Sequence, residues 1–317
     1  MFELILPHLP PRLQDAILSP DYSEICVNED GRVFVEAAGS NAMLELPGIA
    51  PSATQLRHAV NAIARTLAHC EADENNPILN ARLPDGSRVA AMLPPVTDSV
   101  VLTVRKFRPN WFTLEELVAN GTLLSAFYDE LIRAVEDRKN ILISGSTGSG
   151  KTTLVKALLD LIPENERVLL IEDTAELPLE RPNRVRFVAR EGVFIRDLLK
   201  ASLRHRPDRI IVGEVRDGAA YDLLEALTTG HAGSISTIHA NSAPHALNRL
   251  ARLALHADTG LPFSSIQSEI ADAIQYVAYI ERRGSCRQLT HLTQIAGFDS
   301  HSGNWELLPA SGISNCK

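Results

Sequence analysis

The sequence predicts an α/β protein in two parts: a small N-terminal α+β domain and a larger domain around a mostly parallel β-sheet. Its length of 317 residues is that of two ordinary domains, at about 100–200 residues each. From residue 122 onward, short apolar runs alternate with helical patterns, which is typical of strands joined by crossover helices. Several of these runs are apolar throughout, as expected for parallel strands buried on both faces.

Residues 1–107 have the patterns of the smaller domain. Two strand patterns, at 24–27 and 32–35, flank a turn rich in Asn, Asp and Gly, which indicates a β-hairpin. Residues 53–70 carry apolar side chains at helical spacing, and residues 100–104 predict a last strand. We therefore expect a mixed α+β domain over this part of the chain.

Residues 108–121 are expected to connect the two domains. Pro109 cannot continue a strand or a helix comfortably at the start of this segment. Thr113 and Glu116 form a capping box that predicts a short helix, and an Asn-Gly pair predicts its end. The larger domain is therefore expected over residues 122–317.

The larger domain alternates helices and strands. A 3.6-residue apolar period over 124–135 indicates its first helix. Four strand candidates then alternate with three helix candidates, and the tail over 275–308 has the pattern of antiparallel strands. The strands are expected at 141–143, 168–171, 210–212 and 234–238, and the helices at about 150–162, 193–204 and 218–228.

Composition restricts the class of protein. Hydrophobic residues make up 45% and charged residues 22%, so the chain has ample material for a core and is not wholly disordered. No segment has 18 uninterrupted apolar residues, and the acidic start, interrupted by Pro7, lacks the pattern of a signal peptide. These features predict a cytoplasmic protein without a membrane-spanning helix.

The charge balance argues against non-specific nucleic-acid binding. The chain carries 31 basic and 39 acidic residues, a net charge of −8, and only 5% aromatic residues. It therefore lacks a general attraction to phosphate backbones. The cysteines form no CxxC pair, so neither a zinc site nor a disulfide framework is expected, and the thiols fit a reducing compartment. They are Cys26, Cys70, Cys286 and Cys316.

A phosphate-binding loop is the most specific motif. Residues 145–152 match G-x-x-x-x-G-K-[ST] in full, between an apolar strand and a helix. Glycines let backbone N–H groups turn toward an anion, Lys151 suits the β- and γ-phosphates, and Thr152 supplies a hydroxyl to Mg²⁺. The motif predicts nucleotide binding, with ATP and Mg²⁺ as the expected ligands. The expected contact residues are Gly145, Ser146, Thr147, Gly148, Ser149, Gly150, Lys151, Thr152 and Thr153.

Polar groups follow three more of the predicted strands. Glu172 and Asp173 end the second apolar run, Glu214 follows the third and His239 the fourth. Ligand sites of open α/β sheets form at the carboxyl ends of the strands, so these groups are expected beside the phosphate loop. The set predicts a catalytic ATPase in which Glu172 or Glu214 activates water. Glu214 also lies where the metal-organising acid is expected.

Each of these residues also has a simpler interpretation. Glu172 could cap a helix or form a surface ion pair. Arg216, counted here with the catalytic groups, could contact phosphate, form a subunit-interface ion pair or lie in solvent. His239 could be a satisfied core residue, but its position and a second histidine, His231, favour a role in sensing the γ-phosphate.

Four segments together resemble the ATPases of type II and type IV secretion. This family comprises hexameric motors of secretion systems and of type IV pili. Gly213-Glu214 is the family's own form of its third box, where many P-loop enzymes carry Asp. Residues 145–152, 171–176, 206–217 and 229–240 resemble, in order, the Walker A, Asp, Walker B and His boxes.

The smaller domain is similar to that of the conjugal transfer (Trb-type) branch. The similarity lies in residues 23–36, 83–88 and 104–106, and the whole resemblance spans about residues 20–280. The chain has no tetracysteine motif of the kind that assembly ATPases often carry. The resemblance implies a type IV secretion or conjugation ATPase, with a type IV pilus or type II secretion ATPase as an alternative.

The resemblance also implies a RecA-like P-loop domain in a homo-hexamer, with nucleotide between the two domains. The phosphate-contacting arginines of the smaller domain fall on Arg88 and Arg105. The acid that polarises water falls on Glu172 and the Walker B acid near Mg²⁺ on Glu214, so the identity of the general base stays open. Hydrolysis would move the smaller domain. The implied partners are inner-membrane secretion-channel proteins, which would hold the chain peripherally at the membrane.

Two rival classes are compatible with a phosphate loop. A DNA-translocating motor would need a basic channel with stacking aromatics and would show salt-sensitive DNA binding. An assembly platform would bind nucleotide without releasing phosphate. The acidic composition argues against the first, and the complete set of acids argues against the second.

Overall fold

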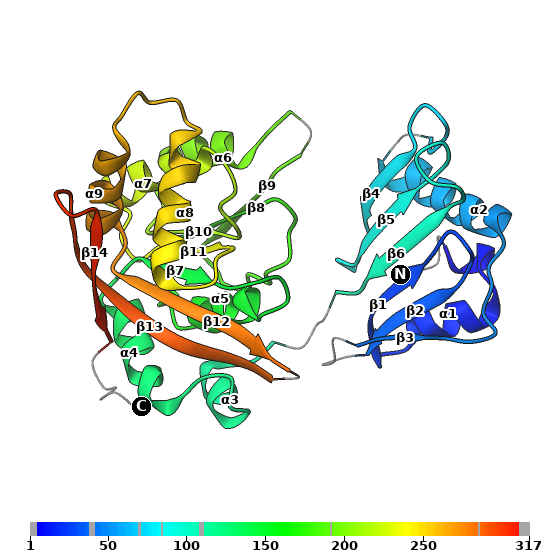
Figure 1. Ribbon diagram of the computed structural model, residues 1–317, viewed down its shortest axis with the longest axis horizontal. Coiled ribbons are helices and arrows are strands. Elements are labelled where there is room, and N and C mark those ends of the chain that lie inside the picture. Colours follow the sequence, from blue (N-terminus) through cyan, green and yellow to red (C-terminus); the bar gives the residue numbers. More distant parts are fainter. Residues whose placement is uncertain are drawn as a thin grey trace. The chain divides into compact units, whose positions relative to one another are not determined.

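The computed structural model describes residues 5–37, 42–68, 71–83, 85–107, 111–190, 192–284 and 286–310. The chain divides into two compact units, residues 1–110 and 111–317, each with its own sheet (Figure 1). Cys70, Cys316 and the linker residues 108–110 lie outside the described residues. Within the described part, no helix is both long and apolar enough to cross a membrane.

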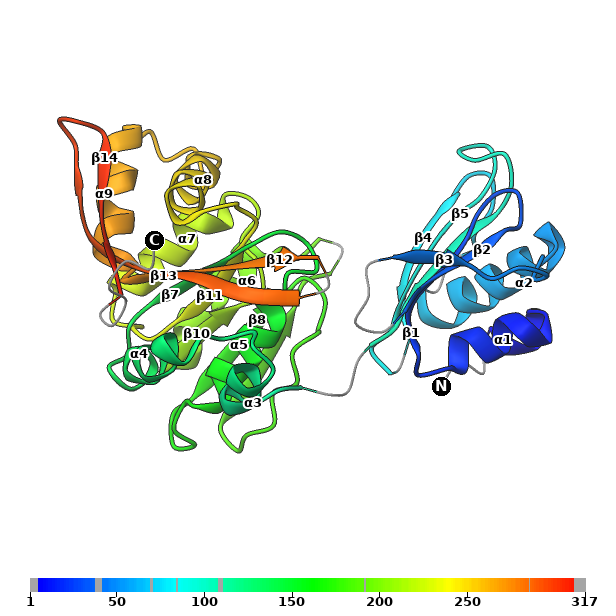
Figure 2. The ribbon, with the colours of Figure 1, turned by 60° about the horizontal axis from the view of Figure 1, so that its bottom comes forward.

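The smaller unit is an antiparallel sheet with helices on one face (Figure 2). Alternate side chains of its strands, such as Ile25 and Val27, are buried with those of helices α1 (Pro11–Leu18) and α2 (Ala53–Ile63). Strands β1 and β2 form the predicted hairpin. The strand order is β3-β2-β1-β6-β5-β4, with β1 Tyr22–Val27, β2 Val33–Ala37, β3 Met43–Glu45, β4 Ile78–Arg82, β5 Arg88–Met92 and β6 Val101–Arg105.

Helix α2 begins with a complete capping box. The Ser52 hydroxyl accepts the backbone N–H of Gln55, and the Gln55 side chain accepts the N–H of Ser52. Leu56 and Val60 lie on its buried face, as the apolar period predicts. The helix continues into a single π-helical turn at Ala64–Ala68, close to the predicted end.

The larger unit has an eight-stranded sheet in the order β14-β13-β12-β7-β11-β10-β8-β9. Every neighbouring pair from β12 to β9 is parallel, which confirms the predicted α/β class and its mostly parallel sheet. The strands are β7 Ile141–Ser144, β8 Val168–Glu172, β9 Arg184–Val188, β10 Arg209–Val212, β11 Ile235–Ile238, β12 Tyr276–Arg283, β13 Cys286–Asp299 and β14 Asn304–Pro309.

Helices cover both faces of this sheet. Along β7, Ile141 and Ile143 pack with α3, α4 and α5, whereas Leu142 packs with the helices on the opposite face. Strand β7 is therefore buried on both sides, as predicted for an apolar run without alternation. The helices are α3 Leu114–Ala119, α4 Ser125–Glu136, α5 Lys151–Asp160, α6 Ile195–Ser202, α7 Ala219–Thr228, α8 Ala243–Leu255 and α9 Phe263–Ala273.

Helix α3 lies in the segment expected as a linker. Thr113 and Glu116 form the predicted capping box at its start. Leu114 and Leu117 are buried in the core of the larger unit, and Trp111 packs against that core. The part of this segment from Trp111 onward therefore belongs structurally to the larger unit.

The tail extends the central sheet beyond β7. Strand β12 pairs antiparallel with β13, and β13 with β14, as predicted for this region. In addition, β12 pairs parallel with β7, with Tyr279 opposite Ser144. The tail thus supplies the outer neighbour of the strand that leads into the phosphate loop. The structure also adds α1, α8, α9, β3 and β9 to the expected elements.

Candidate functional site

The phosphate loop connects β7 to α5 and has a backbone that requires glycine. A Cβ on Gly145 would lie 2.2 Å from the carbonyl oxygen of Ile280 on β12. Gly150, at the start of α5, has φ +106°, a conformation that other residues rarely adopt. Ser146, Thr147 and Gly148 form the exposed apex of the loop. The loop is therefore closely packed at its base and open at its apex.

Lys151 folds back onto this loop. Its buried Nζ donates hydrogen bonds to the carbonyl oxygens of Gly145 at 2.9 Å and Ser146 at 2.8 Å. Burial lowers the pKa of Lys151, and the charge of Glu214 acts in the opposite direction. The Ser149 hydroxyl oxygen is buried without a hydrogen-bond partner among the described residues. A cationic side chain and an unsatisfied hydroxyl in a glycine loop suit an oxyanion ligand.

Thr152 and Thr153 are half-buried in the first turn of α5, the position predicted for them. The first N–H groups of a helix have no partner within the helix, so this turn favours negative charge. The described residues contain no group of three or more His, Cys, Asp or Glu side chains that could hold a metal ion by themselves. The hydroxyl of Thr152 and the carboxylate of Glu214 are hard oxygen donors, which suit Mg²⁺ completed by phosphate oxygens and water.

Glu214 lies just beyond β10 and has two cationic or protonatable neighbours. Arg216 Nη2 donates to its Oε2 at 2.8 Å, and His239 Nε2 lies 3.2 Å from its Oε1. Burial raises the pKa of Glu214, but the hydrogen bond and charge of Arg216, together with the charge of Lys151, act against burial, and the pKa is lowered overall. Glu214 is therefore a carboxylate, close to the loop lysine.

His239 follows β11 and completes this group. Burial and the charge of Lys151 lower its pKa, and Glu214 acts against them. The ring is therefore neutral at neutral pH, because its ordinary pKa of 6.5 is already lower than 7. A neutral imidazole can donate one hydrogen bond and accept another.

Arg216 connects the ends of two strands. Besides Glu214, its Nη1 lies 3.2 Å from Asp173 Oδ2, just after β8. Both groups of this ion pair are partly exposed. Sequence reasoning named Asp173 only as the neighbour of Glu172 and assigned it no role. The structure brings Asp173 to the group formed by Lys151, Glu214, Arg216 and His239.

Glu172 has a different environment from that expected. It is buried, and its Oε1 accepts the backbone N–H groups of Glu176 at 2.8 Å and Leu177 at 2.9 Å. Its Oε2 lies 3.5 Å from Arg186 Nε on β9. Burial, the dominant influence, raises its pKa, although these hydrogen bonds and Arg186 act against it. These contacts hold the turn after β8.

Gly213 packs directly against this glutamate. A Cβ on Gly213 would lie 3.2 Å from Glu172 Cγ and 3.6 Å from the carbonyl oxygen of Ile171. A larger residue would press on the buried carboxyl side chain. The close approach gives a physical reason for glycine at the place where many P-loop enzymes carry Asp.

Arg88 and Arg105 belong to the smaller unit and face each other across β5 and β6. Arg82 on β4 lies opposite Arg88, and Glu24 on β1 lies opposite Arg105. Because strand side chains alternate, these residues share the sheet face opposite the buried residue Val104. Sequence reasoning did not include Arg82 in this row.

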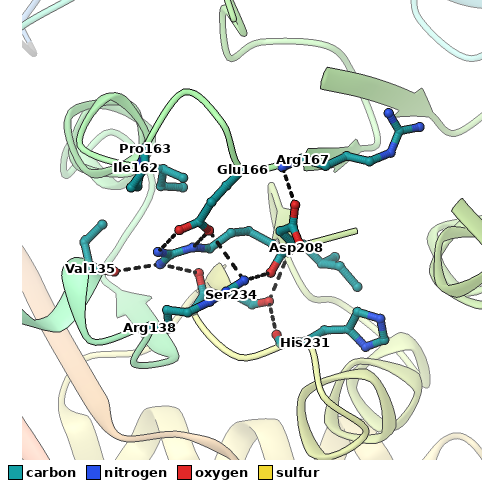
Figure 3. Close-up of polar contacts among 12 residues, drawn as sticks. Val135, Arg138, Ile162, Pro163, Glu166, Arg167, Asp208, His231 and Ser234 are labelled. Carbon is teal, nitrogen blue, oxygen red and sulfur yellow. Dashed lines mark hydrogen bonds and ion pairs between the residues drawn. The ribbon is translucent and has the colours of Figure 1, made fainter. Parts of the chain in front are cut away.

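His231, labelled in Figure 3, precedes β11, whereas His239 follows it, so the two histidines lie at opposite ends of this strand. His231 Nδ1 is 3.1 Å from the carbonyl oxygen of Ala226, and its own carbonyl accepts the Ser234 hydroxyl at 2.9 Å. It therefore stands at the start of β11, whereas His239 stands at its end. The structure does not bring the two histidines together.

Arg209 is the central buried side chain at the amino ends of these parallel strands. It is buried at the start of β10 and binds Glu166 through Nε at 2.6 Å and Nη2 at 3.1 Å. Its Nη1 also donates to the carbonyl oxygen of Val135 at 2.8 Å. Sequence reasoning quoted Arg209 only as part of a motif. Arg209 also donates to the carbonyl oxygen of Gly233 at 3.4 Å, and no local pattern could show that its partners come from three separate segments.

Comparison with known proteins identifies the family. The family model for type II/IV secretion system proteins matches residues 12–317. The chain belongs to the type II/IV secretion system protein family. This assignment confirms the resemblance predicted from the four boxes.

Several curated relatives are similar over most of the chain. It is 36% identical over 304 residues to the conjugal transfer protein TrbB of Rhizobium radiobacter, covering 92% of each protein. It is 34% identical to the type IV secretion system protein VirB11 of Bartonella quintana, covering 75% of this chain and 77% of VirB11. These relatives place the chain in the TrbB and VirB11 part of the secretion family.

Solved structures support the fold. The VirB11 ATPase of Brucella suis, in complex with sulphate, is 30% identical with a TM-score of 0.50, over 92% of this chain and 97% of VirB11. The pilus retraction motor PilT with bound ADP has a TM-score of 0.65 at 21% identity, over 95% of this chain and 82% of PilT. The latter likeness concerns the fold alone.

Proposed function

We propose that this member of the secretion family is a Mg²⁺-dependent ATPase that works as a homo-hexameric motor of a type IV secretion or conjugation apparatus. The observation that carries the proposal is the convergence of Lys151, Glu214 and His239 beside a glycine loop at one sheet edge. The names of the relatives, a conjugal transfer protein and a VirB11 ATPase, support the biological setting.

Lys151 is the group that receives the phosphates. In the structure its ammonium group is held by two loop carbonyls, both of which are uncharged acceptors. A phosphate oxygen carries negative charge and forms a stronger, charge-assisted hydrogen bond. Lys151 therefore exchanges carbonyl contacts for phosphate contacts when ATP binds. It then stabilises the charge that develops on the transferring phosphoryl group.

Glu214 is the stronger candidate for the group that activates water. It is ionised, lies near Lys151 and is within 3.2 Å of His239, so it can accept a proton at this site. Glu172 uses one carboxylate oxygen for two backbone hydrogen bonds and is drawn toward Arg186 by the other. Mg²⁺, held by Thr152 directly and by Glu214 through water, would neutralise phosphate charge.

His239 and Arg216 respond to the state of the phosphate. His239, neutral beside Glu214, can donate to or accept from the γ-phosphate region without adding charge. Arg216 binds two carboxylates, Glu214 and Asp173, and can transfer one of its hydrogen-bond donors to a phosphate oxygen. Loss of the γ-phosphate would return Arg216 to both acids.

The smaller unit supplies the moving part. Arg88 and Arg105 stand side by side on one sheet face, with Glu24 opposite Arg105, so two guanidinium groups lie together where a phosphate group can bind. Hydrolysis would release this contact and let the unit move. Turnover of Arg105→Ala equal to that of the wild type would contradict this coupling.

The hexamer would act with inner-membrane channel proteins and stay peripheral to the membrane through them, on the cytoplasmic side. These assignments rest on the relatives' names and on the family. DNA translocation remains the competing function. It predicts DNA binding that falls steeply as salt rises and ATP turnover that DNA stimulates.

Phosphate release measured across size-exclusion fractions tests the proposal. We expect Mg²⁺-dependent ATP turnover that elutes at the size of a hexamer of the 34.7 kDa chain. Activity confined to monomer-sized fractions would contradict the ring. A nucleotide-bound protein that releases no phosphate would instead be an assembly platform.

A further inference from the structure

The β12–β13 hairpin packs beside the phosphate loop. Strand β12 pairs with β7 up to Ser144, the last residue before the loop. The Ile280 carbonyl oxygen then comes so close to Gly145 that a side chain there would collide with it. The returning strand β13 carries Arg287, which lies opposite Arg282. None of the four recognised boxes includes this hairpin.

Arg287 contacts the loop in two ways. Its Nε donates a hydrogen bond to the carbonyl oxygen of Gly148, at the exposed apex, at 2.9 Å. Its aliphatic stem lies beside Gly150, where Cδ is 3.3 Å from the position that a Cβ would occupy. One side chain thus touches both the apex of the loop and the first residue before α5.

The contact with Gly148 sets the direction of the next peptide N–H. In a trans peptide the C=O and N–H groups point to opposite sides. Because Arg287 holds the Gly148 carbonyl on the side of β13, the Ser149 N–H of the same peptide points to the other side, toward the loop carbonyl of Ser146, which accepts it at 3.3 Å. Inward N–H groups are what a phosphate-binding nest needs.

We infer that Arg287 is a positioning residue for the polyphosphate chain of the substrate, because it fixes the loop apex in its anion-binding form. The inference rests on the proposed function and deepens it. The hairpin stands on one side of β7, and Glu214 and His239 follow strands on its other side. Arg287 therefore acts on binding, and the acid and histidine act on the chemistry.

The test compares Arg287→Met with Arg283→Met. Methionine keeps an unbranched stem beside Gly150 but removes the donor and the charge. Arg283 lies on the same hairpin, where it is paired with Glu281 at 2.7 Å, and its replacement removes the same charge at an exposed place. Dissociation constants are measured for ATP and for inorganic tripolyphosphate, and kcat and KM for ATP.

We expect Arg287→Met to weaken both ligands by the same factor, about tenfold for one lost charge-assisted hydrogen bond. KM should rise about as much, with kcat within roughly threefold of the wild type, because the groups at the opposite side of β7 are unchanged. Arg287→Lys should recover part of the affinity, since lysine restores a cationic donor. Arg283→Met should bind both ligands as the wild type does.

Three results would overturn the inference. Unchanged affinity for both ligands would show that the contact does not position the loop. Weaker binding of ATP with unchanged binding of tripolyphosphate would show that Arg287 contacts the nucleoside and not the phosphates. An equal loss of affinity in Arg283→Met would show that the effect comes from the positive charge of the hairpin and not from the contact with Gly148. A wild-type protein that binds neither ligand would instead overturn the proposed function itself, and this inference with it.

Discussion

The parallel strands of the larger unit end at two edges of the sheet, the carboxyl edge where the strands end and the amino edge where they begin. These two edges use the same kinds of side chain in different ways. At the carboxyl edge, Lys151 rests on two carbonyl oxygens, and Glu214 is shared between Arg216 and His239. At the amino edge, Arg209 is 1% exposed and binds both oxygens of Glu166. Arginine and glutamate therefore form part of the candidate site at one edge and a buried ion pair at the other.

The difference lies in whether the contacts can be exchanged. Glu214 and Arg216 are partly exposed, so water or phosphate can replace either partner. Arg209 is buried, so separating it from Glu166 would leave a buried guanidinium without its charged partner, which is costly. The contacts at the amino edge are therefore expected to contribute more to stability than the contacts at the carboxyl edge.

The largest effect is expected at the exchangeable edge. Lys151→Ala removes the cation that stabilises the transferring phosphoryl group, so ATP turnover should fall about 10³-fold or more. Lys156→Ala, on the same helix but paired with Asp160, is the matched control and should keep its turnover. Phosphate release at saturating ATP measures both. Retained activity in Lys151→Ala would show that the two edges do not differ as described.

A stability measurement tests the fixed edge. Arg209→Met leaves the Glu166 carboxylate without its bidentate partner, and the free energy of unfolding should fall by about 3 kcal/mol. Arg138→Met removes a more exposed arginine that lies 3.5 Å from the same carboxylate, and it should cost less than about 1 kcal/mol. Urea titrations give both values. Equal losses would show that burial does not distinguish these contacts.

The third prediction separates the two glutamates that compete for the role of base. Glu214→Gln should slow turnover by roughly 10²-fold while ATP binding persists, because the proton acceptor is lost. Glu172→Gln keeps an oxygen for the N–H groups of Glu176 and Leu177, so its turnover should stay within about tenfold of the wild type. The reverse order of the two variants would return the role of base to Glu172.

The smallest effect is a pH dependence of stability. Burial raises the pKa of Glu172 above its unfolded value of 4.5, so the folded state takes up the proton more readily. The stability from this group is present below pH 4.5 and is lost as the pH rises through the raised pKa. The advantage of the wild type over Glu172→Gln in unfolding free energy should therefore shrink from acid to neutral pH.

Urea titrations at several pH values follow this difference. The exposed residue Glu180, further along the same segment, provides the control variant Glu180→Gln. Its difference from the wild type should not show the trend expected for Glu172. A difference for Glu172→Gln that grows toward neutral pH would contradict the burial of an ionisable group at that position.

Local sequence patterns predicted most of the fold and the centre of the site. The phosphate loop, the parallel strands and the positions of Glu214 and His239 follow from motif spacing and from the rule that parallel strands end at one edge. The choice between Glu172 and Asp173 does not follow, because consecutive strand residues point to opposite sides. If the end of β8 is predicted one residue too early or too late, Glu172 and Asp173 are assigned to the wrong sides of the strand.

Contacts between distant segments were beyond sequence reasoning. Arg287 and Gly148 are 139 residues apart, and Arg209 and Glu166 are 43 apart. Each arginine has an ordinary local context, and only the pairing of strands brings its partner near. The same holds for Arg82, whose place beside Arg88 depends on the register of a hairpin.

The pairing of β12 with β7 has a consequence for biosynthesis. The strand before the phosphate loop gains its outer neighbour only after the ribosome has added residue 276 and those that follow. Until then the base of the loop lacks the Ile280 backbone that confines Gly145. Because such distant pairings form late, the base of the phosphate loop should reach its final packing in a nascent chain only after β12 has emerged.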